Sequence, residues 1–263
     1  MRPDDAEADG VGAAARSRVD SFDIWYTQKN SLTCHQMASL PCTSEHHDAM
    51  EDFILRHLAE GVLVVGVQGV QGCGKSYACQ MLSRRLQNAG YACVCISLDD
   101  FYFPRSIMGW DVVRGPPGTH DVRLLQDTLQ SLRAGAASVR LPVFDKSVHE
   151  GRGDRVGWRD VVIESPRVVV LVEGWCLGFE PDGDTSGPVA TYHEMLSELF
   201  DAFIVLRSDF QRAYEWRERA ERIMRAKGDG GMTPEEVRSF VAAYMPYYET
   251  HLFLKTLPQT PFI

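Results

Sequence analysis

A single glycine-rich segment limits what this chain can fold into more than any other part of its sequence. The segment Gly69–Ser76 reads G-V-Q-G-C-G-K-S and matches the pattern G-x-x-x-x-G-K-[ST] at every fixed position. An unbroken apolar run, Val62–Val67, precedes it, and apolar residues at helical spacing follow it until Gly90. The sequence therefore predicts a strand, a phosphate-binding loop and a helix in succession, which is the context that this motif requires.

Each residue type in this loop suits a chain of phosphates. The glycines let successive backbone N–H groups turn inward, and the N-terminus of the following helix adds the positive end of its dipole. Lys75 would reach the outer phosphates, and Ser76 would offer its hydroxyl to Mg²⁺. The alternative is a chance glycine-rich turn, but both flanks match the motif. We therefore expect a nucleotide triphosphate to contact Gly69, Gln71, Gly72, Cys73, Gly74, Lys75, Ser76 and Tyr77.

Composition excludes several other classes of protein. The 263 residues, 44% of them hydrophobic, can bury the core of one α/β domain. A formal charge of −9 argues against a nucleic-acid or anionic-membrane partner, and no apolar run approaches the ~20 residues that span a bilayer. The acidic start matches neither a secretory signal nor a transit peptide, so we expect a cytoplasmic protein. We expect a disordered tail over 1–18 and a single domain over 19–263; the oligomeric state is left open.

The cysteines also point to a reducing compartment. There are seven, an odd number without the paired spacing of a metal site. Cys93 and Cys95 alternate along a predicted strand and read as small buried residues rather than as a redox pair. Cys73 lies at a helix start, where the thiolate is favoured, so we expect its oxidation to block nucleotide binding.

Carboxylates follow two of the predicted strands. The buried strand Tyr91–Leu98 ends at Asp99 and Asp100, and the strongest apolar run, Arg167–Val172, ends at Glu173. In open parallel sheets ligands bind beyond the carboxyl ends of the strands. One of the two aspartates could simply cap a turn, and we favour a functional role for Asp99. Glu173 stands at the Walker-B position, where a carboxylate holds Mg²⁺ directly or through water.

Two loops carry further candidates. Asp121 suits the N-cap of a helix, and that structural role could explain it entirely, whereas Arg114 and His120 before it have no such role. After a short strand, Val139–Phe144, the loop Asp145–Arg155 alternates charges. This loop could be solvated and self-neutralising, or its cations could clamp an anion, and the composition does not separate the two readings.

The last third predicts a helical lid over about 209–232. A capping box at Ser208 opens a helix whose glutamates and arginines mostly pair at i,i+4. Arg212 and Arg217 lack such a favourably ordered partner, so we expect them to reach over the nucleotide, with 228–231 as a hinge. A further strand, Ala202–Leu206, completes four strands interleaved with helices. These predict an α/β fold with a doubly wound, mainly parallel sheet between two helical layers.

Taken in order, these motifs resemble the D-glycerate 3-kinases of the plant type, within the phosphoribulokinase and uridine kinase superfamily of P-loop kinases. The resemblance covers about residues 19–252. Uridine and pantothenate kinases share only the more general pattern. The motifs that carry it are Gly69–Ser76, Ser97–Tyr102, Arg114–Asp121, Leu141–Ser147, Glu150–Arg155, Glu173–Phe179 and Tyr244–Pro246.

The resemblance implies a role for each candidate. Asp99 would be the general base, Lys75 the contact to the β- and γ-phosphates, and Ser76 and Glu173 the Mg²⁺ ligands. Arg212 and Arg217 would belong to the lid. The acceptor site would comprise Asp99, Tyr102, Arg114, His120, Asp121, Lys146, His149 and Arg152, with one of the loop cations meeting a substrate carboxylate.

We therefore expect a kinase that uses ATP and Mg²⁺ to phosphorylate a small hydroxylated acid, with D-glycerate and its 3-hydroxyl preferred. The alternatives are another acceptor, such as a nucleoside or pantothenate, and a nucleotide-binding regulator without turnover. The resemblance also implies a final strand after the Tyr244–Pro246 helix. The sequence there is polar and broken by proline, so we expect that strand position to be filled poorly.

Overall fold

The computed structural model describes residues 21–28, 31–35, 44–58, 61–183, 186–207, 210–227 and 231–251. The expected tail over 1–18 lies outside these ranges, as do 228–230 of the expected hinge and the stretch after residue 251 where a final strand was considered. In the ranges described, no helix is long and apolar enough to cross a membrane.

A six-stranded sheet forms the centre of the molecule, in the order β2-β1-β8-β3-β7-β4. The four strands expected from the sequence pair in parallel: β3 (Gly61–Gly69), β4 (Ala92–Ser97), β7 (Arg167–Gly174) and β8 (Ala202–Arg207). An antiparallel hairpin, β1 (Ser21–Gln28) and β2 (Ser31–His35), extends the sheet beyond β8. The sequence did not predict these two strands.

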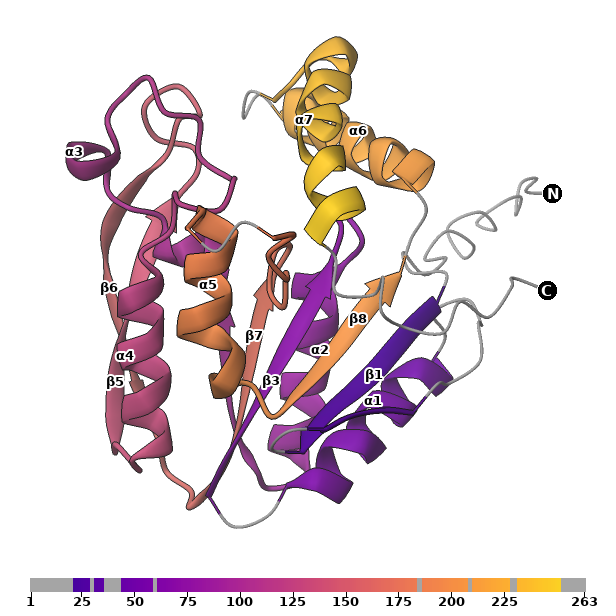
Figure 1. Cartoon of the computed structure of the whole chain (residues 1–263), viewed down its shortest axis with the longest axis vertical. Helices are drawn as coiled ribbons and strands as arrows, with labels where there is room; N and C mark the ends of the chain where they lie inside the picture. The colour runs from indigo at the N-terminus through magenta and orange to yellow at the C-terminus, as the bar shows by residue number, and fades with distance from the viewer. Residues whose placement is uncertain are drawn as a thin grey trace, which may run out of the picture.

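Helices cover both faces of this sheet, which confirms the expected three-layer fold (Figure 1). One layer contains α1 (Ser44–His57) and α2 (Lys75–Asn88), and the other contains α4 (Val122–Arg133) and α5 (Pro188–Leu196). Residues Val168 to Val172 of β7 are all at most 3% exposed. A strand covered on both faces has no polar side to present, which is why its sequence is a continuous apolar run.

Local signals set the helix starts. The Asp121 side chain accepts the backbone N–H of Leu124 at 3.1 Å and caps α4, as expected. At the start of α7 (Pro234–His251), the backbone N–H of Thr233 donates to Glu236 and the backbone N–H of Glu236 donates to the Thr233 hydroxyl. This reciprocal pair is the capping box that the sequence predicts.

A two-stranded antiparallel sheet, β5 (Ser138–Asp145) and β6 (Asp154–Val162), stands beside the carboxyl end of β4. The expected strand over Val139–Phe144 is part of β5, but β6 was not predicted. Arg159 on β6 donates to the carbonyl of Cys95 at 2.9 Å and ties the hairpin to the main sheet. Short turns of helix complete the fold: η1 (Leu98–Phe101), α3 (Arg105–Met108) and η2 (Ser197–Leu199).

The last two helices, α6 (Phe210–Lys227) and α7, lie above the carboxyl ends of the central strands (Figure 1). Glu221, only 3% exposed, accepts the backbone N–H of Met232 at 2.8 Å and so fixes the start of α7 against α6. Helix α7 continues through Pro246 to His251. The helical pair therefore covers the edge of the sheet where ligands of open α/β folds bind.

Candidate functional site

Three neighbouring parallel strands carry the candidate residues to one edge of the sheet. Glu173 on β7 lies opposite Val67 on β3 and opposite Ser97 on β4. The phosphate loop follows β3 directly, and Asp99 follows β4 within η1. The strand order therefore gathers residues that are about a hundred positions apart in the sequence.

The phosphate loop folds around its own lysine. Lys75 Nζ donates to the carbonyls of Gly69 at 2.8 Å and Val70 at 2.9 Å. Gly72 and Gly74 have φ angles of 83° and 98°, which other residues rarely adopt. A Cβ on Gly72 would also lie 3.3 Å from Trp216 Cβ, so α6 rests directly on the loop.

The expectation that the Cys73 thiolate is favoured is wrong. Its side chain is 0% exposed, and burial raises the pKa of the thiol despite the nearby Lys75. The thiol points toward Gly69, where a Cβ would lie 2.6 Å from Sγ, rather than toward solvent. Desolvation thus outweighs the helix dipole, and the structure gives no support for a reactive thiolate in the loop.

A second cluster consists of two serine hydroxyls that donate to the Glu173 carboxylate. Ser76 Oγ donates to Glu173 Oε1 at 2.8 Å, and Ser97 Oγ donates to the same oxygen at 3.0 Å. Among the residues that the structure describes, no three His, Cys, Asp or Glu side chains gather as a metal cage. An oxygen-only set with a single carboxylate fits Mg²⁺, which takes few protein ligands and completes its shell with water and phosphate. Ser76 and Glu173 are the residues that would hold it.

Asp99 is the most strongly perturbed carboxylate near the loop. Its Oδ2 lies 2.5 Å from Lys146 Nζ, and its Oδ1 accepts the Tyr102 hydroxyl at 3.1 Å. His120 Nε2 lies 3.9 Å from Oδ1. Burial alone would raise the pKa of Asp99, but the ammonium group of Lys146 holds it well below its usual range. Asp99 is therefore ionised at neutral pH.

The charged loop Asp145–Arg155 is held by arginines that bind its backbone. Arg114 donates to the carbonyls of Gly151, at 2.7 Å, and Arg152, and it stacks over Phe144. Arg105 is only 4% exposed and donates to Gly153 at 3.1 Å, to Arg152, and to two carbonyls of the 109–112 turn. Sequence reasoning missed Arg105, because nothing in the local pattern shows that its partners are backbone carbonyls.

The other predicted acceptor residues lie in different surroundings. Asp121 caps α4 with one oxygen and faces Arg155 at 3.8 Å with the other. His149 pairs with Asp154 at 3.6 Å, edge-on to Trp110, and the Arg152 side chain is exposed. Of the predicted acceptor set, the structure gathers Tyr102, His120 and Lys146 around Asp99, with the charge of Arg114 nearby.

Helix α7 contacts both the phosphate loop and the loop Arg114–Asp121, called the acceptor loop below because it carries three of the predicted acceptor residues. The Tyr248 hydroxyl donates to Gln71 Oε1 at 2.9 Å. One turn earlier, Tyr244 packs on Gly115, where a Cβ would lie 1.9 Å from its hydroxyl. Trp175, next to Glu173, donates to the Gly115 carbonyl at 3.0 Å and stacks edge-on against both tyrosines.

The expected lid arginines are only partly described. Arg217 pairs with the buried Glu221 at 2.5 Å and stacks on Phe240 at 4.9 Å, and its buried Nε has no hydrogen-bond partner among the residues that the structure describes. The side chain of Arg212 lies outside the described residues. Tyr77 is 56% exposed in the first turn of α2.

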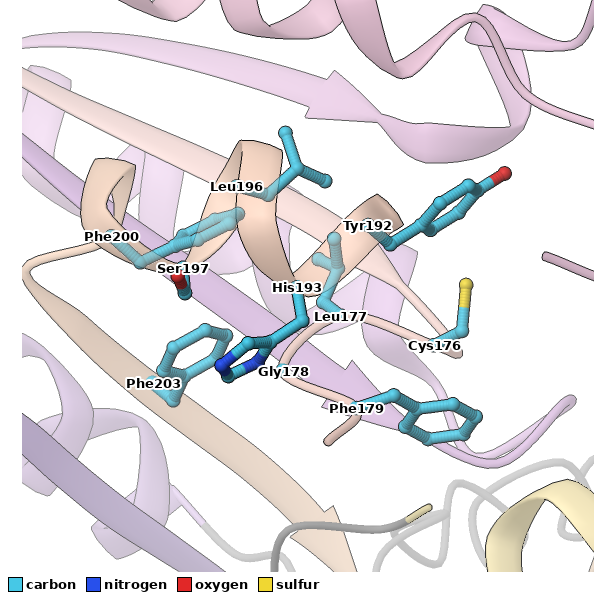
Figure 2. Close-up of a pocket in the computed structure, with 10 residues that line it drawn as sticks. All are labelled: Cys176, Leu177, Gly178, Phe179, Tyr192, His193, Leu196, Ser197, Phe200 and Phe203. Carbon is cyan, nitrogen blue, oxygen red and sulfur yellow. The ribbon is translucent and has the colours of Figure 1, made fainter. Parts of the chain in front are cut away.

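A small apolar cavity lies between the segment after β7 and α5 (Figure 2). Its volume of about 20 Å³ leaves room for little more than one water, so it cannot hold a substrate. A wider groove of about 410 Å³ lies between the first part of α6 and the first part of α7. Its lining residues are Gln211, Tyr214, Glu215, Glu218, Pro234, Val237 and Arg238.

The proteins that this chain resembles in sequence include several described as kinases. The chain is 32% identical over 222 residues to the chloroplastic D-glycerate 3-kinase of Arabidopsis thaliana, across 72% of this chain and 48% of that protein. It therefore spans about half the length of this relative. It is 31% identical over 234 residues to a Saccharomyces cerevisiae protein described as a probable ATP-dependent kinase, across 72% of this chain and 78% of that protein. No protein-family model matches the chain.

Solved structures agree with this. A D-glycerate 3-kinase from Cryptococcus neoformans superposes with a TM-score of 0.65 at 29% identity, covering 79% of this chain and 88% of the other. A Bacillus stearothermophilus structure described as a possible uridine kinase shares the fold, with a TM-score of 0.51 at 19% identity over 82% and 96% of the two chains. The phosphate loop, the strand-end carboxylates and these relatives together show that the chain belongs to the family of P-loop ATP-dependent kinases that includes D-glycerate 3-kinase.

Proposed function

We propose that this kinase transfers the γ-phosphate of Mg-ATP to the 3-hydroxyl of D-glycerate, with 19–263 acting as one domain. The observation that carries the proposal is the ionised Asp99 at the end of β4, two strands from the phosphate loop and paired with Lys146. A carboxylate at that place suits the approach of an acceptor hydroxyl to a bound triphosphate. The choice of D-glycerate is supported by the names of two relatives.

The nucleotide half of the site works by charge and position. The backbone of Gly69–Ser76 would surround the β- and γ-phosphates, and Lys75 would exchange its two carbonyl partners for phosphate oxygens. Ser76 and Glu173 would hold Mg²⁺, which neutralises phosphate charge when bound. Arg217 and Arg212, on the helix that rests on Gly72, would act as the lid.

The acceptor half supplies orientation and a proton acceptor. As the bond from the glycerate 3-oxygen to the γ-phosphorus forms, the bond to the β-γ bridging oxygen breaks, ADP leaves, and the hydroxyl proton passes to Asp99. A carboxylate with a depressed pKa is a weak base, so it suits a loose transition state in which the proton moves late. Lys146, beside Asp99, and the neighbouring Arg114 are the cations available to the substrate carboxylate.

The decisive experiment measures ADP release with Mg-ATP and each of four acceptors: D-glycerate, L-glycerate, uridine and pantothenate. We expect turnover with D-glycerate alone, and its loss in Lys75→Ala. Turnover with uridine or pantothenate instead would show that this compound, and not D-glycerate, is the acceptor. No turnover with any acceptor, while ATP still binds, would favour a nucleotide-binding regulator.

Replacing Asp99 by Asn tests the proposed base without changing the size of the side chain. We expect kcat to fall by about 10²- to 10⁴-fold, the range for loss of general base catalysis, with little change in ATP affinity. Turnover and nucleotide binding are measured on the same preparation. A variant with near-normal turnover would refute the assignment of Asp99.

A further inference from the structure

His120 is buried beside Asp99 and has an unused donor position. Its side chain is 0% exposed, and its Nε2 has no hydrogen-bond partner in the described part of the chain. A buried polar nitrogen without a partner costs free energy comparable to a lost hydrogen bond, so its retention needs a reason. The carboxylate oxygen Asp99 Oδ1 lies 3.9 Å from this nitrogen.

The proton on His120 is placed by Tyr192. The Tyr192 hydroxyl accepts the backbone N–H of Gly118 at 2.9 Å and of His120 at 3.1 Å. A phenol oxygen has two acceptor positions and one proton, so both acceptor positions are filled. The remaining contact, 2.8 Å to His120 Nδ1, must be the one in which Tyr192 donates. A neutral His120 then carries its only N–H on Nε2, the nitrogen that faces Asp99.

Burial supports this assignment, because it lowers the pKa of His120 and keeps the ring neutral. The His120 ring also stacks on the Tyr102 ring, which limits its rotation; the two centroids are 4.2 Å apart and the two planes are inclined by 22°. The hydroxyl of Tyr192 points away from Phe200 and Phe203 of the small cavity, so its polar end serves the loop of His120 rather than that cavity (Figure 2).

The two oxygens of Asp99 therefore face different partners. Oδ1 accepts from Tyr102 and faces the Nε2–H of His120, whereas Oδ2 pairs with Lys146, whose side chain is 56% exposed. A separation of 3.9 Å is too long for a hydrogen bond, but catalytic contacts often shorten only when substrate binds.

We propose that Tyr192 and His120 are positioning residues for the general base: Tyr192 fixes His120 as the Nε2–H tautomer, and that N–H closes onto Asp99 Oδ1 when the acceptor binds. With Oδ1 held by two donors, the carboxylate keeps one orientation and presents Oδ2 to the acceptor hydroxyl. The inference rests on the proposed function, since it assigns the support of the base in that same reaction. His120 then acts through Asp99 rather than by touching the substrate.

The first test removes only the hydroxyl in Tyr192→Phe. We expect kcat with D-glycerate to fall about tenfold, because the hydrogen bond that orients His120 Nδ1 is lost together with the two that the hydroxyl accepts from the backbone, while KM for D-glycerate and for ATP stays within about twofold. The matched control is Tyr91→Phe, which removes a hydroxyl near the opposite end of β4 and should leave kcat unchanged. A raised KM for D-glycerate with unchanged kcat would mean that His120 contacts the substrate directly and would overturn the proposal.

The second test compares two amides at His120. A glutamine amide nitrogen can reach the position of Nε2, whereas an asparagine nitrogen reaches only that of Nδ1, so His120→Gln should retain more kcat than His120→Asn. Thermal unfolding of both variants shows whether each is folded. Equal activity in two folded variants would contradict a donor that acts on Asp99.

The third test needs no turnover. ¹⁵N NMR of the imidazole rings should show His120, assigned by its absence in His120→Gln, as the neutral Nε2–H tautomer in wild type, with mixed tautomers in Tyr192→Phe. A wild-type Nδ1–H tautomer would overturn the inference even in an active kinase. If D-glycerate is not the acceptor, the proposed function fails, but this spectrum still decides the tautomer.

Discussion

At the scale of single residues, the pairing of Asp99 with Lys146 should determine how the proposed base responds to pH. Tyr102 and His120 face one oxygen of Asp99, Lys146 faces the other, and Arg114 lies close enough to add charge. Because the cations depress the pKa of Asp99, the ionised form persists below the ordinary Asp pKa of about 3.9 and is lost only as pH falls through the lower folded value.

Replacing Lys146 by Met should therefore move the acidic limb of the kcat/KM profile to higher pH, whatever the loss in absolute rate. Without Lys146, burial of Asp99 favours the protonated, inactive form over a wider range. The profile is measured with D-glycerate and Mg-ATP, because the pH dependence of kcat/KM reports the pKa values of groups in the free enzyme. Arg140→Met, which removes an exposed cation paired with Asp160, should leave the limb in place. An unmoved limb in Lys146→Met would refute the pairing.

The sequence alone leads to those residues whose proposed role follows from a local motif. Lys75 and Ser76 are fixed by the loop pattern, and Glu173 and Asp99 by their places at strand ends. The burial of Cys73 and the carbonyl partners of Arg105 depend on segments that are distant in the sequence, so they could not be predicted. Tyr192 is a case of the same kind, because its three contacts lie more than 70 positions away.

At the scale of secondary-structure elements, aromatic rings at and before β8 lie so close to β3 that one position of β3 requires glycine. Gly66 lies beside Phe203 in the parallel pairing, and a Cβ there would come within 2.4 Å of the Phe203 ring and 3.2 Å of Phe200. Its backbone has an ordinary φ, so the requirement is one of space. The close packing of this strand pair supports the phosphate loop that follows β3.

We expect Gly66→Ala to lower the free energy of unfolding by about 1–3 kcal/mol through overpacking, measured by denaturant or heat. Phe203→Leu in that background should recover part of the loss, so the two changes should not be additive. Gly157→Ala on β6, where a Cβ would meet nothing within 4 Å, is the matched control and should be tolerated. Equal losses from both glycines would contradict the packing argument.

The elements that the sequence failed to predict lack a strong local signal. β6 mixes charged, glycine and apolar residues and is largely exposed, so its extended form depends on pairing with β5. β1 does contain Phe22, Ile24 and Tyr26 in alternation, a signal that could have indicated a strand. By contrast, β7 and α4 were predictable, because a doubly buried strand and a capped amphipathic helix each leave a clear pattern.

At the scale of the whole molecule, α7 links the two halves of the site. Tyr248 holds Gln71 of the phosphate loop, and Tyr244, one turn away, packs on Gly115 of the acceptor loop. A rigid helix that contacts both loops should make the binding of one substrate favour the binding of the other.

D-glycerate should therefore tighten the binding of a non-hydrolysable ATP analogue about fivefold or more, the lower range of typical coupling. Tyr248→Phe should weaken this effect, because it removes the contact to Gln71. Isothermal titration with and without D-glycerate gives the ratio of dissociation constants. Tyr214→Phe, which removes a hydroxyl that joins α6 to Arg238 outside the site, should keep the wild-type ratio. Full coupling in Tyr248→Phe would show that α7 does not transmit it.

The position of β1 sets the order in which the sheet can be completed on the ribosome. β1 pairs with β2 a few residues away, but its other partner is β8, as in the pairing of Ser21 with Arg207. At about 5–20 residues per second, roughly 10–40 s of synthesis separate these two strands. The hairpin therefore emerges long before the strand that covers its inner edge, and the nascent chain must keep that edge from pairing elsewhere until β8 appears.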